Sequence, residues 1–404
     1  MNVWPWALLL ALAAASCLMS AKPIVAWRET VWICAWLLTL VVLIEALRDT
    51  AVRNLALISV VIGQFMYALL TSTMLLYGLL FEQVSSVWHA FPGYANPRFF
   101  NHVQTLSLPL LSAYSVWSGA AQLWRRLAAA TTVLHVLLLC FFLGRATIVG
   151  VTVATVLVCL LLRETRLLKA LITYAGLGVL LYAIGFQVLP ALFDAPNAPA
   201  FRDPTERGSI EARLYLWRIA SQAIQEHPWL GLGPMHFAHT PNGEAAHPHN
   251  IYLQLAAEFG IPFTAVTLGL LIHWLRARWL ALRVMPTLPC AQIEVGCFIG
   301  ICAALIDGLF SGNFVMPLSQ SWLALCVGLL VASPLNQRAP ASQDITQTKQ
   351  RWAMTAVSVA MCGALALFLT NMAQELTHPE VNLLQGPSLS PGLYNPRFWL
   401  DGWF

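Results

Sequence analysis

Residues 55–81 read LALISVVIGQFMYALLTSTMLLYGLLF, a stretch of 27 residues without a charged side chain. An α-helix rises about 1.5 Å per residue, so roughly 20 apolar residues cross the hydrocarbon core of a bilayer. A helix also satisfies its backbone hydrogen bonds internally, which is necessary because lipid offers no partner for them. This stretch therefore predicts a membrane-spanning helix and decides the fold class.

The composition of the whole chain agrees with a membrane protein. Of its 404 residues, 58% are apolar and 10% are charged, and the mean hydropathy is +0.68. A soluble domain carries roughly 25% charged residues, so this chain cannot cover a water-facing surface. The net charge of +4 is small and dispersed, which argues against a nucleic-acid partner. A soluble enzyme and a nucleic-acid-binding protein are both excluded.

Ten further apolar stretches resemble the first, so we expect an all-α polytopic membrane protein with about 11–12 transmembrane helices. The expected spans cover residues 4–20, 31–46, 55–81, 105–123, 128–143, 147–162, 170–192, 251–275, 290–310, 319–332 and 352–370. We interpret the first stretch as a retained helix, because no small-residue cleavage site and soluble region follow it. The spans divide the chain into an N-terminal bundle (1–192), a large outer loop (193–250), C-terminal spans (251–370) and a short tail (371–404).

The distribution of Lys and Arg orients these spans. Cytoplasmic loops carry an excess of basic residues. With the N-terminus inside, 13 of the 22 basic residues fall in inside loops. This orientation places two polar segments, residues 82–104 and 193–250, on the outside.

The first outside segment contains the run Phe91 to His102, in which two prolines and a glycine argue against a helix. Its aromatic residues are typical of the membrane–water boundary. Arg98 in this run is a candidate for contact either with lipid headgroups or with a substrate.

The second outside segment is the main hydrophilic region. Residues 209–226 show apolar side chains at steps of three and four, which predicts a helix with Ser209 as its cap. Arg213 and Trp217 are four residues apart and share one face of this helix, with Arg218 one position further round. A turn rich in Gly and Pro follows at 228–233. His249 and Asn250 then stand where the chain re-enters the membrane.

Histidines are concentrated in this segment. Five of the ten lie within 23 residues, at His227, His236, His239, His247 and His249. A cluster of this kind suggests a metal site, and His247 with His249 would be the first pair to test. Their spacing does not match the usual arrangement of zinc ligands, so the metal interpretation is the weaker one.

An outer loop with arginines and a re-entering histidine above an apolar bundle suits a substrate that is both a lipid and an anion. A lipid-linked diphosphate has both properties. The guanidinium of arginine pairs with phosphate oxygens through two hydrogen bonds and is permanently charged. Histidine titrates near neutral pH and is the natural base for an attacking hydroxyl.

Three motifs resemble a known family. Arg213-x-x-x-Trp217, Pro228-x-Leu-Gly-x-Gly233 and His249-Asn250-x-x-Leu253-(x)4-Glu258-x-Gly260 are similar to the signature of the O-antigen ligase and O-antigen polymerase superfamily, most of all to O-antigen ligases. Bacterial protein O-oligosaccharyltransferases share this signature. The resemblance implies a membrane glycosyltransferase with a fold like that of the GT-C class.

The resemblance also implies an activity and a location. The enzyme would move an O-antigen glycan from undecaprenyl diphosphate to a hydroxyl of lipid A-core oligosaccharide, a step of lipopolysaccharide biosynthesis. It would lie in the bacterial inner membrane with its active site facing the periplasm, and it would need no metal, nucleotide or other cofactor. Its partners would be the lipid-linked donor, the lipid A-core acceptor and membrane lipid, without nucleic acid.

By position, the resemblance assigns His249 as the base and Arg213 as the main contact of the diphosphate. Arg145, which lies in an outer helix turn, resembles an arginine that the family supplies from its first half, and Arg218 and Arg98 are weaker candidates for the same diphosphate.

Four further residues have less specific expectations. Trp217 either packs or stacks on a sugar, and Asn250 supports the site. Glu258 and Asp307 are expected within spans, where each either pairs with a basic residue or lines a wet cavity.

Other functions stay open. An O-antigen polymerase or a protein O-oligosaccharyltransferase would use the same donor, and the acceptor, the sugar and the stereochemical course distinguish them. A transporter or flippase for the lipid-linked glycan would share the arginines but would not need His249. The count of eleven spans places the C-terminus outside, and a second helix hidden in 55–81 would reverse this.

Overall fold

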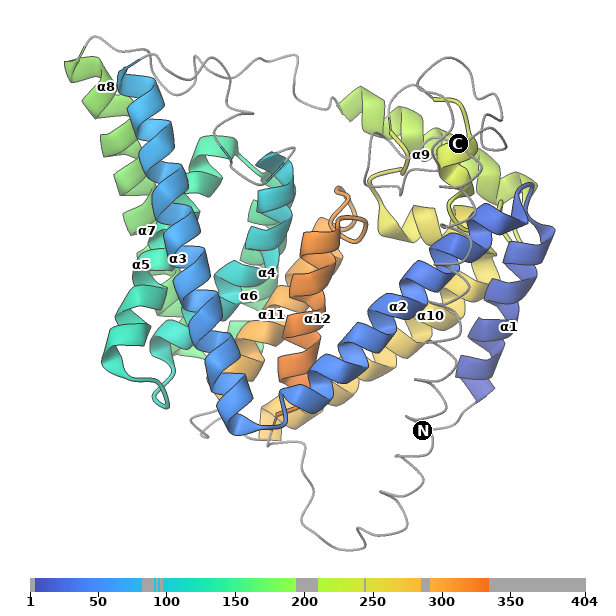
Figure 1. The fold of residues 1–404 in the computed structure, drawn as a ribbon, viewed down its shortest axis with the longest axis horizontal. Coiled ribbons are helices and arrows are strands. Elements are labelled where there is room, and N and C mark those ends of the chain that lie inside the picture. The colour runs from blue at the N-terminus through green and yellow to red at the C-terminus, as the bar shows by residue number, and fades with distance from the viewer. Residues whose placement is uncertain are drawn as a thin grey trace, which may run out of the picture. The chain divides into compact units, whose positions relative to one another are not determined.

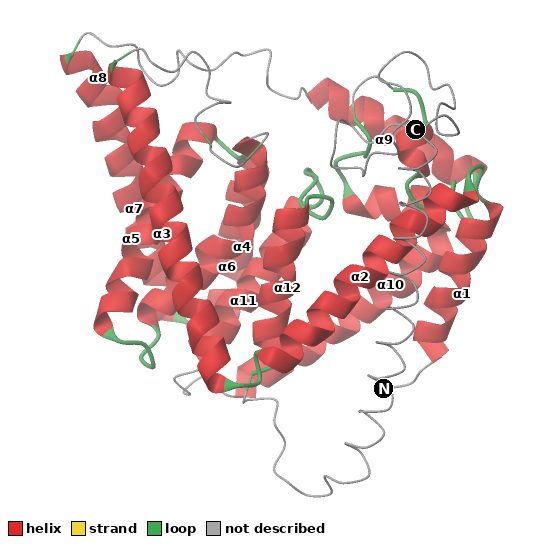
Figure 2. Ribbon diagram, viewed as in Figure 1, coloured by secondary structure: helices red, strands yellow, loops and turns green. Residues whose placement is uncertain are grey.

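The structure is a computed structural model that describes residues 4–81, 91, 94, 97–193, 210–242, 245–284 and 291–333. Every regular element in these ranges is a helix (Figures 1 and 2), which confirms the all-α class. The predicted span at 352–370 and the tail at 371–404 lie outside the described residues.

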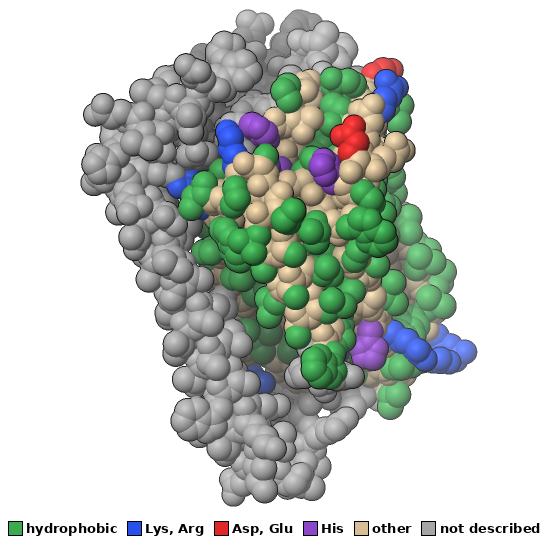
Figure 3. Space-filling model, turned by 90° about the vertical axis from the view of Figure 1, so that its right-hand side faces the viewer, with side chains coloured by type: hydrophobic (Ala, Val, Ile, Leu, Met, Phe, Trp, Pro, Cys, Tyr) green, Lys and Arg blue, Asp and Glu red, His purple; other side chains and the backbone are tan. Residues whose placement is uncertain are grey.

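Among the described residues, six helices are long and apolar enough to cross a membrane: Pro23–Ala46, Thr50–Leu80, Gln122–Phe142, Arg145–Leu162, Thr165–Leu192 and Ile251–Val284. The apolar helices Trp4–Met19 and Pro317–Val331 are shorter. Hydrophobic side chains fill the middle of the face drawn in Figure 3, and charged and histidine side chains gather at its ends. The chain is therefore a multi-pass membrane protein, and the total of 11–12 spans stays a prediction.

The stretch that decides the fold class is one continuous helix, α3 (Thr50–Leu80). The Asp49 side chain caps it by accepting hydrogen bonds from the backbone N–H of Ala51 at 2.8 Å and of Val52 at 3.1 Å. Such caps satisfy donors that the first helical turn leaves unpaired. No second helix is hidden in this stretch.

The chain divides into two compact units. Unit 1 contains residues 1–42, 209–277 and 337–404, and unit 2 contains residues 43–208 and 278–336. Among the described residues, unit 1 contains α1 (Trp4–Met19), α9 (Ile210–Glu226), the 3-10 helix η5 (His236–His239), most of α2 (Pro23–Ala46) and most of α10 (Ile251–Val284). The expected division at residues 192, 250 and 370 concerns membrane spans and stays a prediction.

Unit 2 is built around α4 (Pro97–Val116), most of whose side chains are buried although many are polar. It packs against α5 (Gln122–Phe142), α6 (Arg145–Leu162), α11 (Ala291–Asp307) and α12 (Pro317–Val331). A side chain at Gly300 of α11 would meet the Leu106 carbonyl oxygen at 3.1 Å, so the α4 and α11 backbones approach closely. Helices α3, α7 (Thr165–Ala183), η2 (Ile184–Val188) and α8 (Leu189–Leu192) also belong to this unit.

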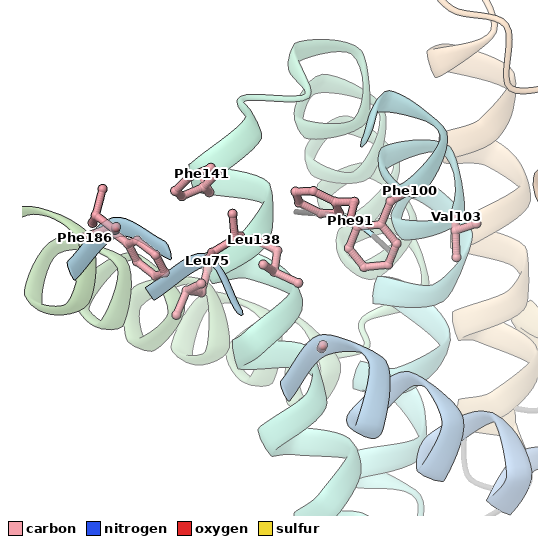
Figure 4. Packing of buried hydrophobic residues seen from close by; sticks show 10 residues of the cluster. Leu75, Phe91, Phe100, Val103, Leu138, Phe141 and Phe186 are labelled. Atoms are coloured by element: carbon pink, nitrogen blue, oxygen red, sulfur yellow. The ribbon is translucent and has the colours of Figure 1, made fainter. Parts of the chain in front are cut away.

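The start of α4 corrects one prediction. We expected residues 82–104 to form a loop, but the helix begins at Pro97 and includes Arg98 and His102. Proline suits the first helical position because its missing N–H would have no partner there. Phe100 and Val103 in this turn pack into an aromatic core with Phe91 (Figure 4). Hydropathy missed the turn because its polar side chains are buried by protein rather than by lipid.

Candidate functional site

The expected helix at 209–226 is α9, which begins at Ile210; Ser209 lies outside the described residues. The apolar face of α9 is buried against η5 and α10, where Leu216 and Ala220 contact a cluster that includes Phe237 and Ala257. Of the expected arginines, Arg213 is half-buried and Arg218 is exposed. The helix therefore presents Arg213 closer to the protein interior than Arg218.

The turn that follows α9 is bound to a break in α10. Gly260 has φ 84° and ψ 168°, which are not helical values, so α10 is kinked there. The turn makes three backbone bonds to this region: from Leu232 N–H to the Ala257 carbonyl at 2.8 Å, from Gly233 N–H to the Glu258 carbonyl at 2.9 Å and from Ile261 N–H to the Pro228 carbonyl at 2.8 Å. The break thus frees backbone groups that the turn then satisfies.

This contact explains the glycines of two motifs. Gly231 has φ +69°, and a side chain there would collide with the backbone of Glu258. A side chain at Gly260 would likewise collide with the Trp229 carbonyl. The positive φ of each residue also favours glycine. The two motifs therefore form one packed junction, which holds the turn at 228–233 against the kink of α10.

Glu258 lies at this junction and is buried. Its Oε1 accepts a hydrogen bond from the Phe237 N–H at 3.1 Å, and its backbone carbonyl accepts one from the Ser16 hydroxyl at 3.0 Å. These bonds tie Glu258 to η5 and α1. The expected basic partner or wet cavity stays a prediction.

His236 connects the segment to the turn between α1 and α2. Its Nε2 accepts a hydrogen bond from the Lys22 backbone N–H at 2.9 Å, so the proton is on Nδ1, which donates to the Pro234 carbonyl at 2.9 Å. The side chain is buried. Burial lowers the pKa of His236, although the Pro234 carbonyl acts in the opposite direction.

His249 is placed by its neighbours at the start of α10. Asn250 is the helix cap: its Oδ1 accepts from the N–H of Tyr252 at 3.0 Å and of Leu253 at 3.1 Å. Trp217 Nε1 donates to the Pro248 carbonyl at 3.0 Å. This bond joins α9 to the residue immediately before His249, so the expected packing role of Trp217 includes a specific hydrogen bond.

The five histidines have different environments. His227 and His239 are exposed, His236 and His247 are buried, and His249 is half-buried. In the part of the chain that the structure describes, no three or more His, Cys, Asp or Glu side chains come together in a way that could hold a metal ion.

Two expected arginines belong to unit 2. Arg145 is the first residue of α6 and is exposed. It follows a tight turn in which Leu143 is left-handed and Gly144 precedes the helix, so the expected helix turn is confirmed. Arg98 is half-buried in the first turn of α4.

Sequence reasoning named Asp307 but missed the buried polar cluster around it in unit 2. Asp307 is completely buried, and its Oδ2 accepts a hydrogen bond from the hydroxyl of Thr105 at 2.6 Å. The Thr147 hydroxyl lies 3.4 Å from the same oxygen and donates to the Asn101 carbonyl at 3.0 Å. The cluster joins α4, α6 and α11, and its member Thr147 lies two residues after Arg145 in α6. No local pattern signals it, because its members are far apart in the sequence.

Comparisons with known proteins agree with the motifs. Residues 130–268 match the sequence model of a family described as O-antigen ligase. The matched range includes Arg145, Arg213 and His249 but not Arg98. The chain is also 30% identical over 272 residues to a protein named O-antigen ligase from Pseudomonas aeruginosa strain PAO1, covering 62% of this chain and 60% of that protein. The chain thus spans about 60% of the length of this curated relative.

Proposed function

Because residues 130–268 match the sequence model of a family described as O-antigen ligase, we propose that this membrane protein transfers a glycan from undecaprenyl diphosphate to lipid A-core oligosaccharide. The transfer takes place at the periplasmic face of the bacterial inner membrane. His249 is the general base, and arginines stabilise the diphosphate that leaves.

The proposed reaction is a displacement at the anomeric carbon of the glycan. A hydroxyl oxygen of the acceptor forms the new bond to this carbon, and the bond from the carbon to the diphosphate oxygen breaks. His249 takes the hydroxyl proton, and undecaprenyl diphosphate leaves with the electron pair of the broken bond. Negative charge grows on the leaving group, so preorganised cationic donors lower the barrier.

One observation carries this proposal: the hydrogen bond from Trp217 to the Pro248 carbonyl. Trp217 and Arg213 are four residues apart on α9, so their side chains are neighbours on one face. The bond therefore turns the Arg213 face of α9 toward the segment that ends in His249. A cation for the diphosphate and a base for the hydroxyl are supplied by the same small part of unit 1.

Three other arginines are proposed as donor contacts on the strength of the resemblance. Arg145 lies inside the range that matches the family, at a helix N-terminus, where backbone N–H groups favour anions. Arg218 is exposed on α9, so its contact would be with substrate at the outer surface. Arg98 lies outside the matched range, and its assignment depends only on its charge and its place in unit 2.

The proposed acceptor rests on the resemblance to O-antigen ligases, the name that the relative also carries. An O-antigen polymerase would join the glycan to a second glycan, and a protein O-oligosaccharyltransferase would join it to a protein. These reactions use the same donor and the same base, so His249 and Arg213 do not distinguish them.

The test is reconstitution of the full chain in liposomes with an undecaprenyl-diphosphate glycan. Lipid A-core, a second glycan unit and a pilin-like protein are offered as separate acceptors, and we expect product on lipid A-core alone. His249→Ala should abolish transfer while donor binding persists, and Arg213→Ala should reduce kcat about 100-fold. His227→Ala is the matched control, because His227 is an exposed histidine of the same segment.

Three results would contradict the proposal. Product on another acceptor would replace the ligase assignment with that of a polymerase or protein glycosyltransferase. Undiminished transfer by His249→Ala would show that His249 is not the general base. Movement of the lipid-linked glycan across the bilayer without transfer would identify a flippase.

A further inference from the structure

The backbone of His249 has an unusual conformation. Its φ is +52°, in the left-handed region that residues other than glycine adopt at a cost. Such a conformation persists where surrounding contacts hold it. The residues that provide these contacts therefore determine where the imidazole of His249 is presented.

Hydrogen bonds hold this turn at three successive residues. Trp217 binds the carbonyl of Pro248, and Asn250 caps the helix that follows. The third bond is made by the backbone of His249 itself: its N–H donates to Nδ1 of His247 at 3.2 Å. An Nδ1 that accepts a bond carries no proton, so the proton of neutral His247 is on Nε2.

The two imidazole rings also contact each other. Their centroids are 4.2 Å apart, and their planes meet at 66°. His247 is 5% exposed, whereas His249 is half-buried. His247 thus lies on the protein side of His249 and restricts the rotamers that the second ring can adopt.

Building on the proposed function, we propose that His247 is a positioning residue for His249. Its Nδ1 fixes the left-handed backbone of His249, and its ring fixes the orientation in which His249 receives the acceptor proton. His247 touches neither the donor nor the acceptor. In the His-Pro-His-Asn sequence, His249 thus takes the proton in the reaction, and His247 holds His249 in the position that the reaction requires.

The experiment compares two substitutions in the full reconstituted chain. His247→Ala removes the acceptor, and His247→Asn retains an acceptor atom at the δ position. Small displacements of a catalytic group cost up to about 100-fold in rate. We therefore expect H247A to lower kcat by about 10- to 100-fold with an almost unchanged KM for the donor. H247N should recover a large part of this loss.

A second measurement is independent of turnover. Hydrogen exchange at the His249 amide should be faster in H247A than in the wild type, and H247N should restore the protection. If H247A does not fold, His247→Leu replaces it, because leucine fills the buried site without an acceptor. His227→Ala again serves as the exposed histidine control.

Wild-type kcat in H247A, or in its replacement H247L, would overturn the inference. An H247N variant no faster than H247A would also overturn it, because the retained acceptor would then have no effect. If the wild type and His249→Ala transfer equally well, the proposed function itself fails. Loss of transfer in His249→Ala with full transfer in H247A overturns only the role of His247.

Discussion

At the scale of single residues, histidines of the outer segment are distinguished by what they bind. His236 accepts a bond from Lys22, 214 positions away in the chain, and His247 accepts one from His249, two positions away. The sequence identifies the cluster of five, but it does not distinguish a structural histidine from a reactive one. That distinction depends on burial and on distant partners, which spacing does not encode.

The environment of His236 predicts a pH dependence of stability. Burial lowers its pKa in the folded protein below the ordinary value of 6.5, so the unfolded chain binds more protons as the pH falls below that value. The stabilising contribution of neutral His236 is therefore complete above pH 6.5 and is lost as the pH falls toward the folded pKa. We expect the midpoint of thermal unfolding to fall in this range.

The matched variant is His236→Gln, which retains an acceptor near the position of Nε2 and does not titrate. Its unfolding midpoint should fall less steeply than that of the wild type between pH 7 and pH 5, since other titrating groups affect both proteins equally. Parallel pH profiles for the two proteins would show that His236 titrates in the same way in the folded and unfolded states.

At the scale of elements, hydropathy predicted the helices well where lipid covers them and less well where protein does. The expected spans at 55–81 and 147–162 coincide with α3 and α6. The first turn of α4 was mistaken for a loop, because hydropathy measures transfer into lipid and this turn is buried among other helices. Its polar residues Asn101 and His102 are buried by tertiary packing, which a window along the chain does not include.

The junction between the α9–η5 turn and the α10 kink predicts an asymmetry between two glycines of one helix. Gly260→Ala would place a side chain against the Trp229 carbonyl at a positive φ, which should cost about 1–3 kcal/mol or more of stability. At Gly269 of the same helix, an added Cβ meets no atom within 4 Å. Gly269→Ala should be neutral or stabilise by roughly 0.5–1 kcal/mol.

The measurement is thermal unfolding of the two variants in the same detergent or nanodisc, together with glycan transfer. Gly260→Ala should also reduce transfer, because the kink helps to position the segment that carries His249. Equal unfolding midpoints for the two variants would mean that the junction is not required for stability.

At the scale of the whole molecule, basic residues have two roles, to orient the protein in the membrane and to pair with acidic residues of other helices. The sequence alone did not separate these roles. Arg53 counts among the inside residues that orient the protein, yet it is buried and pairs with Glu294 at 2.7 Å. The two residues are 241 positions apart in the chain. Orientation from basic residues is a statistical property of many loops, so it survives such exceptions, whereas an individual ion pair depends on how distant helices pack.

The described helices give a topology prediction that does not depend on the total number of spans. Three candidate spans, Gln122–Phe142, Arg145–Leu162 and Thr165–Leu192, separate Arg126 from the outer segment, and one more, Ile251–Val284, follows it. An odd number of crossings places Arg126 and His227 on opposite sides of the membrane. We expect this side to be cytoplasmic, because basic residues lie at the helix ends that share it with Arg126. These residues are Arg125, Arg163, Arg166, Lys169, Arg276, Arg278 and Arg283.

Single cysteines introduced at His227 and Arg126 test this arrangement after the nine native cysteines are replaced. Both positions are exposed, so accessibility depends on the side of the membrane rather than on burial. In intact spheroplasts, an impermeant maleimide should label the variant at His227 at once and the variant at Arg126 only after permeabilisation. Labelling of both variants before permeabilisation would show that the two positions lie on the same side, so the number of spans between them would be even. The opposite pattern would place His249 in the cytoplasm and thereby exclude a periplasmic transferase.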